Sequence, residues 1–203
     1  MFKKQIDTTQ PIHELLAGRW SGRAFDPMRP VEQTKVLALL EAARWAPSCY
    51  GDQPWRFVIW DRTRNEVAWH LALDCLAEGN KVWARHAPLL MLACADSLLT
   101  RDGSPNRWGQ YDTGAAAVSL ALQAAALEMT VHQMGGFDSD KARREFNIPD
   151  RYTPMAMIAV GYQLPEFKIP VELKEREYAR RERRPLPESF FESSWGNGVR
   201  VSG

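Results

Sequence analysis

The stretch YDTGAAAVSLALQAAALEM, residues Tyr111–Met129, decides the fold class. At 3.6 residues per turn, alanine and other apolar side chains cover nearly every face of the helix that it predicts. A helix that is apolar nearly all round must be buried on all sides. In a chain of 203 residues this indicates a central helix, part of it at a subunit interface, with alanines that allow close helix approach.

Short apolar runs around this helix predict a sheet. Each run is too short for a helix and is bounded by proline or glycine, which is typical of buried strands. The predicted strands are Phe57–Trp60, Leu89–Ala95 and Met155–Val160, with a brief one at Val131–Gln133.

Helices are predicted between these strands. They span Pro11 to Gly18, Val31 to Trp45, Arg64 to Leu76, and a segment that Asp138 caps and that runs to Phe146. Helical spacing selects the stripes Val36, Leu40, Ala43 and Val67, Leu71, Cys75. Helices and strands that interleave in this way predict an α+β or α/β fold.

The composition excludes several classes of protein. The 26 basic and 25 acidic side chains leave a net charge of +1, which favours neither nucleic acid nor an anionic membrane. Cys49, Cys75 and Cys94 form no pair with disulfide or zinc spacing. The first residues lack the apolar core of a signal peptide, and no apolar run reaches the roughly 18 residues of a membrane span. We expect a cytoplasmic protein.

The C-terminal part differs from the rest of the chain. From Gln163 onward prolines and charges dominate, and Lys174 to Arg184 is strongly basic. This part lacks the apolar periodicity needed to fold alone. It is either an extension that wraps a partner subunit or a frayed terminus.

Two segments carry arginine pairs suited to an anion. Arg19 and Arg23 flank Ser21, and in an extended chain alternate side chains point the same way. Arg181 and Arg183 alternate similarly near the C-terminus. Guanidinium forks match phosphate oxygens and a serine adds a donor, while a solvated surface segment is the alternative.

Two loops could face a flat heterocycle. Residues 46–55 hold Pro47, Ser48 and Gln53 between a helix and a strand, and the two side-chain polar groups could read a ring edge. Gly135 and Gly136 precede a helix and would let the backbone approach a ligand closely. A packed connection and a simple turn are the respective alternatives.

Other common sites are missing. The sequence contains neither G-x-G-x-x-G nor G-x-x-x-x-G-K, which excludes the usual dinucleotide and P-loop motifs. The four histidines have no metal-ligand spacing, and Ser48 has no base partner in the sequence.

Taken in order, these pieces resemble the nitroreductase family of FMN enzymes. The matching segments are Arg19-x-Ser-x-Arg23, Ala46-Pro-Ser with Gln53-Pro-Trp55, Asn80, Ala87–Cys94, Asp112-x-Gly-Ala-Ala, Gly135-Gly-Phe-Asp138 and Arg183-Arg-Pro-Leu186. The resemblance implies one α+β domain over residues 1–203, a three-layer α/β/α sandwich with a mostly antiparallel sheet. It also implies a homodimer with FMN at the interface, and residues from about 163 to 203 packed on the partner subunit.

The resemblance also implies roles for single residues. Arg19, Ser21 and Arg23 would bind the phosphate and ribityl chain, and Arg181 and Arg183 would form a late phosphate clamp. Pro47, Ser48 and Gln53 would line the flavin, Asn80 would contact its ring, and Gly135 and Gly136 would face its edge. Relatives commonly have asparagine in place of Gly51, so one polar contact is either lost or supplied by Asp52.

The implied activity is transfer of two electrons from NADH or NADPH to a nitroaromatic, quinone or enone, with ping-pong kinetics. The chemistry would belong to FMN, so no catalytic side chain is predicted. Five aromatic side chains could line a pocket for flat substrates, with core packing as the alternative for most of them: Trp20, Trp55, Trp83, Trp108 and Tyr111. The alternative functions are reductive dehalogenation, flavin cleavage, and flavin binding without turnover.

Overall fold

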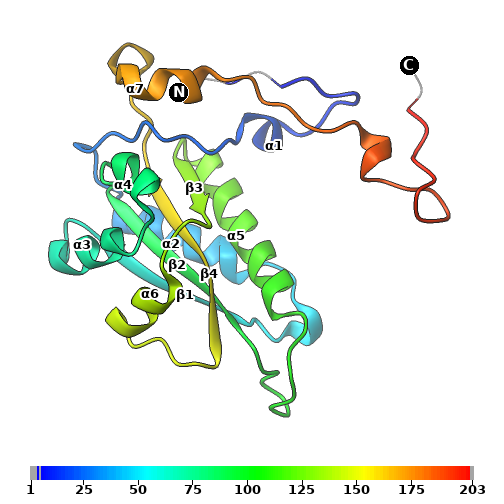
Figure 1. The fold of residues 1–203 in the computed structure, drawn as a ribbon, viewed down its shortest axis with the longest axis horizontal. Coiled ribbons are helices and arrows are strands. Elements are labelled where there is room, and N and C mark those ends of the chain that lie inside the picture. The colour runs from blue at the N-terminus through cyan, green and yellow to red at the C-terminus, as the bar shows by residue number, and fades with distance from the viewer. Residues whose placement is uncertain (1–3, 5, 202–203) are drawn as a thin grey trace.

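The structure is a computed structural model that describes residue 4 and residues 6–201. A four-stranded antiparallel sheet has the order β1-β2-β4-β3 (Figure 1). Its strands are β1 Trp55–Asp61, β2 Leu89–Asp96, β3 Thr130–Met134 and β4 Tyr152–Gly161. The helices are α1 Glu14–Gly18, α2 Gln33–Arg44, α3 Glu66–Asp74, α4 Glu78–Ala84, α5 Gly109–Ala126, α6 Ser139–Glu145 and α7 Val171–Tyr178. Single 3₁₀ turns lie at Cys49–Gly51, Glu166–Lys168 and Leu186–Glu188.

The central strand β2 divides the core into two halves. Leu89 and Met91 pack with α2 and α5, whereas Leu90 and Leu92 pack with α3, α4 and α6 on the opposite face. Successive side chains of a strand point to opposite faces, so a wholly apolar strand requires a helical layer on each side. The predicted α+β class and the three-layer α/β/α sandwich are confirmed.

The helix α5 is buried on one side only. Thr113, Ala116 and Leu120 are at most 1% exposed against α2 and the sheet, but Tyr111 is 77% and Val118 51% exposed. Within one chain, therefore, only the inner face of this helix is buried, and the prediction that it is buried on all sides is not met. On the outer face Tyr111 and Val118 stay at least half exposed in the described part of the chain, although α1 also contacts α5.

The predicted stripes were partly wrong. On α2, Val36 and Ala43 are buried and Leu39 is more deeply buried than Leu40. On α3 the inward face is that of Trp69 and Ala72, while Val67 is 74% and Leu71 37% exposed. Trp69 buries far more apolar area than a valine can, so it sets which side of the helix faces the sheet.

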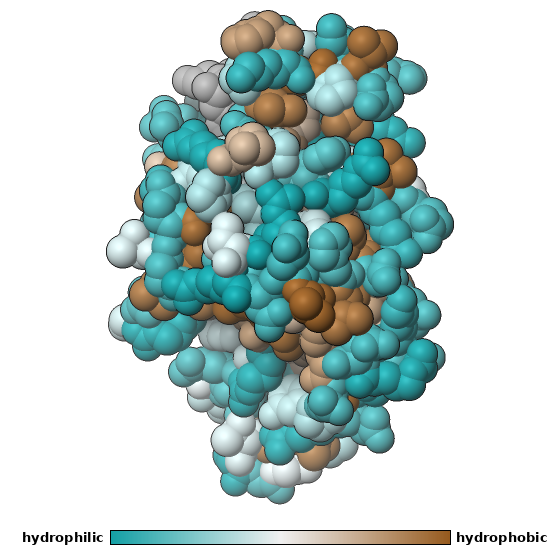
Figure 2. Space-filling view, turned by 90° about the vertical axis from the view of Figure 1, so that its left-hand side faces the viewer, coloured by the Kyte–Doolittle hydropathy of each residue, from teal (hydrophilic) through white to brown (hydrophobic). Residues whose placement is uncertain are grey.

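Figure 2 shows the side of the molecule that carries α3 and α4. This side is mostly hydrophilic, with apolar side chains in small groups. The outer layer formed by these helices therefore presents a mostly polar surface. None of the helices in the described part of the chain is both long and apolar enough to cross a lipid bilayer.

The two ends of the chain run together beyond the body of the sandwich (Figure 1). Gln163 pairs with Phe25 directly after β4, and Arg181 pairs in parallel with Ile6 after α7. Residues 181–201 then continue as an arm with exposed aromatic side chains, among them Phe190 at 57% and Trp195 at 92%. The ends of the predicted 1–203 domain, residues 1–3, 5 and 202–203, lie outside the described residues.

Candidate functional site

The structure brings together arginines from the two ends of the chain. Arg19 follows α1 in an extended conformation. The guanidinium of Arg181 donates to the carbonyl oxygens of Ala17 at 2.6 Å and Arg19 at 2.8 Å. These two bonds fix the C-terminal segment against the turn after α1.

Charge accumulates at this junction. Burial, and then the charge of Arg183, lower the pKa of Arg19. Burial, followed by the charges of Arg19 and Arg183, lowers the pKa of Arg181. None of the three forms a salt bridge with a carboxylate in the described part of the chain. Like charges held together without a counter-ion favour an anionic ligand.

A groove runs beside the arginines of the C-terminal segment, among them Arg181 and Arg183. It has a volume of about 700 Å³ and lies between the N-terminal segment and the arm. Its walls include residues 7–10, Ile12 and residues 180–186. An ion pair between Arg180 and Asp7 joins its two sides.

Arg23 lies in different surroundings from Arg19. Its backbone N–H donates to Oε1 of Glu177 at 2.7 Å, and its guanidinium lies 5.8 Å from the ring of Trp83. Burial lowers its pKa, and its Nε has no hydrogen-bond partner among the described residues. Ser21 lies exposed between the two arginines. The alternating segment thus presents its two guanidinium groups to different neighbours.

A second group of predicted site residues, Asn80 with Gly135 and Gly136, is linked by a hydrogen bond. The Asn80 amide donates to the carbonyl oxygen of Gly136 at 3.0 Å, and the Ala77 N–H donates to the same oxygen at 3.0 Å. A Cβ at Gly136 would lie 3.0 Å from the Asn80 amide nitrogen, whereas a Cβ at Gly135 would meet nothing within 4 Å. Both glycines are exposed, so their backbone is accessible to a flat ligand.

The loop with Pro47, Ser48 and Gln53 is held in an unusual conformation. Tyr50, Gly51 and Gln53 have φ of 55°, 68° and 50°. The Gln53 N–H donates to the Ser48 hydroxyl at 3.1 Å and closes the loop. Left-handed backbone is characteristic of glycine and tolerated by asparagine, so Gly51 adopts a conformation open to either residue.

This loop is anchored on α5 and on the segment before it. Asp112, which is 4% exposed, accepts from the Cys49 N–H at 3.0 Å. The Asp52 carboxylate accepts from the Thr100 N–H at 2.9 Å. Asp52 is therefore engaged within the chain. The loop, between α2 and β1, lies away from α1 and from the junction of the two chain ends (Figure 1). One chain does not bring all the predicted site residues together.

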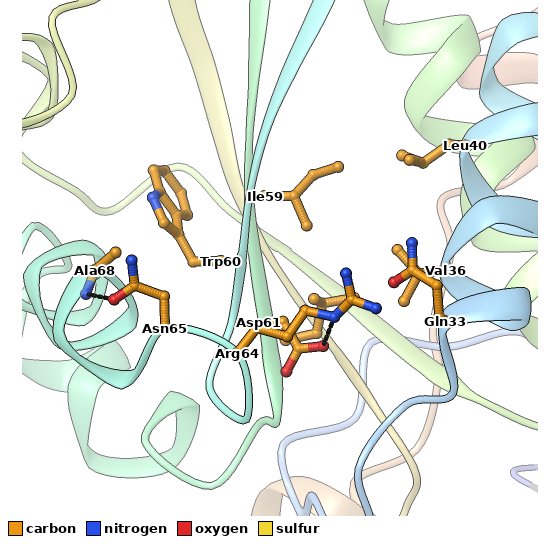
Figure 3. A pocket seen from close by; sticks show the side chains of 10 residues that line it. Gln33, Val36, Leu40, Ile59, Trp60, Asp61, Arg64, Asn65 and Ala68 are labelled. Atoms are coloured by element: carbon orange, nitrogen blue, oxygen red, sulfur yellow. Dashed lines mark hydrogen bonds and ion pairs between the residues drawn. The ribbon is translucent and has the colours of Figure 1, made fainter.

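A separate pocket of about 280 Å³ lies beside the edge strand β1 (Figure 3). Ile59 and Val36 line it from β1 and α2, and Arg64 pairs with Asp61 at its mouth. None of the eleven predicted site residues lines this pocket, and its charged groups neutralise each other. It lacks the features of an anion site.

The nitroreductase family model matches residues 16–162 of this sequence. The chain belongs to the nitroreductase family. The matched region extends from α1 to the end of β4, and it contains all the predicted site residues except Arg181 and Arg183. The resemblance to this family that the sequence motifs indicated is confirmed.

Known proteins similar to this nitroreductase-family chain agree with the assignment. A crystal structure described as an oxidoreductase containing FMN is 34% identical, with a TM-score of 0.85 over 94% of this chain and 96% of the other. A putative NADH dehydrogenase/NAD(P)H nitroreductase of Methanothermobacter thermautotrophicus is 28% identical over 74% of this chain and 76% of its own length. A putative nitroreductase in complex with FMN from Desulfovibrio desulfuricans has the same fold, with 23% identity, a TM-score of 0.69, and coverage of 90% and 96% of the two chains.

The aromatic side chains of the nitroreductase fold separate into two groups. Trp20, Trp55 and Trp83 are at most 8% exposed and belong to the interior, whereas Trp108 is 39% and Tyr111 77% exposed. Core packing thus accounts for the first three. The last two lie at the start of α5, which also anchors the loop of residues 47–53.

Sequence reasoning missed two buried polar residues beneath the arginines. Glu177 on α7 is fully buried, and His132 on β3 is 8% exposed with its Nδ1 3.1 Å from the Gly22 carbonyl oxygen. A signal for Glu177 existed. It lies four residues after the buried Leu173, so the helix has a carboxylate on its apolar face.

Proposed function

We propose that this protein is an FMN-dependent oxidoreductase that passes two electrons from NADH or NADPH to an electron-poor acceptor such as a nitroaromatic, quinone or enone. The observation that carries the proposal is the group of Arg19, Arg181 and Arg183 at the junction of the two chain ends. A terminal phosphate would neutralise these charges, and family membership supports a flavin mononucleotide as its source.

The residues present fit such a cofactor. Arg19 and Arg183 would hold the phosphate, with Ser21 and Arg23 beside the ribityl chain. Arg181 would contribute its remaining N–H groups while it holds the backbone of Arg19. Each guanidinium offers charge-assisted hydrogen bonds, which are about twice as strong as neutral ones.

A second set of groups would orient the ring. Gly135 and Gly136 leave their backbone open, and Asn80 fixes that backbone through the Gly136 carbonyl. When bound, FMN supplies the two-electron chemistry, and the protein binds it, orients it and shields it from water. A nicotinamide donor and the acceptor would use the same space in turn, which predicts ping-pong kinetics.

A second copy of the chain would complete the site. The loop with Pro47, Ser48 and Gln53 lies apart from the arginines of its own chain, and Tyr111 and Val118 are exposed on the outer face of α5 in the described part of the chain. Both features support a homodimer in which each loop reaches the arginines of the partner. The arm of residues 181–201, with its exposed aromatic side chains, would pack on the partner subunit. We place this protein in the cytoplasm.

Purification and a visible spectrum test the proposal. We expect a yellow protein, or FMN uptake on reconstitution, and oxidation of NADH or NADPH with menadione or nitrofurazone. Failure to bind FMN would refute the function. Bound FMN without oxidation of either nucleotide would indicate a non-catalytic flavoprotein. Halide release or loss of the flavin spectrum during turnover would indicate dehalogenation or flavin cleavage.

A further inference from the structure

A single buried carboxylate ties three segments together beneath the arginines. Glu177 lies on α7 and is fully buried. Its Oε1 accepts from the Arg23 N–H at 2.7 Å, and its Oε2 accepts from the Gln163 amide at 3.3 Å. The segment after α1, the exit of β4 and the helix α7 therefore meet at this side chain.

We propose that Glu177 is a positioning residue that sets Arg19 and Arg183 at the spacing required by the phosphate of a bound mononucleotide. This inference rests on the proposed function. Glu177 does not touch the ligand. It acts through the backbone of Arg23 on one side and through the end of α7 on the other.

The connectivity explains the effect. From Glu177 the chain reaches Arg181 in four residues, and Arg181 holds the backbone of Ala17 and Arg19. In the segment after α1, which runs beside the segment after α7, Arg23 is four residues after Arg19. The bonds at Glu177 and at Arg181 thus fix both ends of two short segments that run together. With one of these anchors removed, the separation of Arg19 and Arg183 is no longer defined.

The surroundings require a carboxylate or a close analogue at this position. Among the described residues, Lys4 and Arg23 are the charged groups that face it from other segments. Arg176 lies beside Arg23, and Tyr178 follows on the same helix. A buried acceptor is needed because the Arg23 N–H would otherwise lose its partner. Within the part of the chain that the structure describes, the Gln163 Oε1 has no partner, so the Gln163 amide can turn over and receive a donor.

The test compares the dissociation constants of FMN and riboflavin, measured by flavin fluorescence on the full chain. Riboflavin lacks the phosphate, so the dissociation constant of riboflavin divided by that of FMN reports on the contacts to the phosphate. We expect Glu177→Ala to lower this ratio by about tenfold or more, as expected for a lost charge-assisted contact. Glu177→Gln should retain most of the ratio, because it keeps an acceptor for Arg23 and can donate to Gln163. Glu175→Gln, on an exposed side chain of the same helix, is the matched control.

The outcomes separate the two proposals. A wild-type protein that binds neither flavin overturns the proposed function and this inference with it. A wild-type protein that prefers FMN, together with a Glu177→Ala variant that keeps the preference, overturns only this inference. Equal weakening of both flavins by Glu177→Ala would assign a merely structural role and would also overturn it. If Glu177→Ala does not fold, Glu177→Asp takes its place: its shorter side chain cannot keep both contacts, so its ratio should fall below that of Glu177→Gln, and an unchanged ratio counts against the inference.

Discussion

Acid should destabilise this protein through one buried histidine. His132 is 8% exposed and packs 4.5 Å from the ring of Trp83. Burial above all, and then the charge of Arg23, lower its pKa from 6.5 to about 4, against the opposing effect of the carbonyl groups of Gly22 and Ser21. The imidazole is therefore neutral in the native protein at neutral pH.

The sign and size of the effect follow from linkage. The unfolded chain binds a proton at His132 near pH 6.5, but the native protein does so only near pH 4. Stability is complete above pH 6.5 and is lost as the pH falls between these values. Between pH 7 and pH 5 the loss is about 2 kcal/mol, at 1.36 kcal/mol for each pKa unit.

Urea unfolding at pH 7 and pH 5 measures this loss. His132→Gln stays neutral and can still donate to the Gly22 carbonyl oxygen, so its stability should fall by about 2 kcal/mol less than that of the wild type over the same interval. His70→Gln, on the exposed side of α3, should keep the wild-type dependence. Equal pH dependence in the wild type and in His132→Gln would refute the argument that burial keeps this ring neutral.

Three other substitutions test the site and the interface. Arg183→Ala should weaken FMN binding by about 10- to 100-fold in fluorescence titrations, whereas Arg144→Ala on α6 should not change it. Gly51→Ala should lower the free energy of unfolding by about 1 kcal/mol, because the backbone there is left-handed, whereas Gly51→Asn should be better tolerated; equal losses would contradict the conformational explanation. Val118→Lys should shift the protein towards monomer in analytical ultracentrifugation, and Val67→Lys, at a more exposed valine on α3, should not; a dimer unchanged by Val118→Lys would exclude this face of α5.

The sheet could be predicted well from the sequence. The runs at Phe57–Trp60, Leu89–Ala95 and Met155–Val160 each fall within a strand of the structure. They are continuous and apolar because helices cover both faces of the sheet, and this requirement leaves a strong pattern. The face of α3 could not be predicted, because the choice between Val67 and Trp69 depends on how the helix packs rather than on spacing alone.

Local sequence patterns predicted only part of the candidate site. Spacing paired Arg19 with Arg23 and Arg181 with Arg183, and only the family resemblance implied that the two pairs share one phosphate. In the structure Arg181 donates to the backbone of Arg19, although 162 positions separate them. Spacing could not show that Arg181 binds backbone carbonyl oxygens, because which donors a guanidinium uses depends on the surrounding fold. Glu177 left only a weak signal, a carboxylate four residues after Leu173 on the apolar face of its helix, and its complete burial appears only in the structure.

The division of the site between two places is itself informative. Asp112 anchors Cys49 and its loop on α5, and Tyr111 and Val118 are exposed on the same helix. A second chain that covers α5 would therefore also meet the loop of residues 47–53.

If the loop of one copy reaches Arg19 and Arg183 of the other, substitutions in the two regions should complement each other in mixed dimers. The heterodimer isolated after co-expression of a Ser48→Trp chain with an Arg183→Ala chain should then have one intact site and bind about half the wild-type amount of FMN. If both groups instead serve a site within one chain, the same heterodimer should bind no FMN above the level of the two parent homodimers.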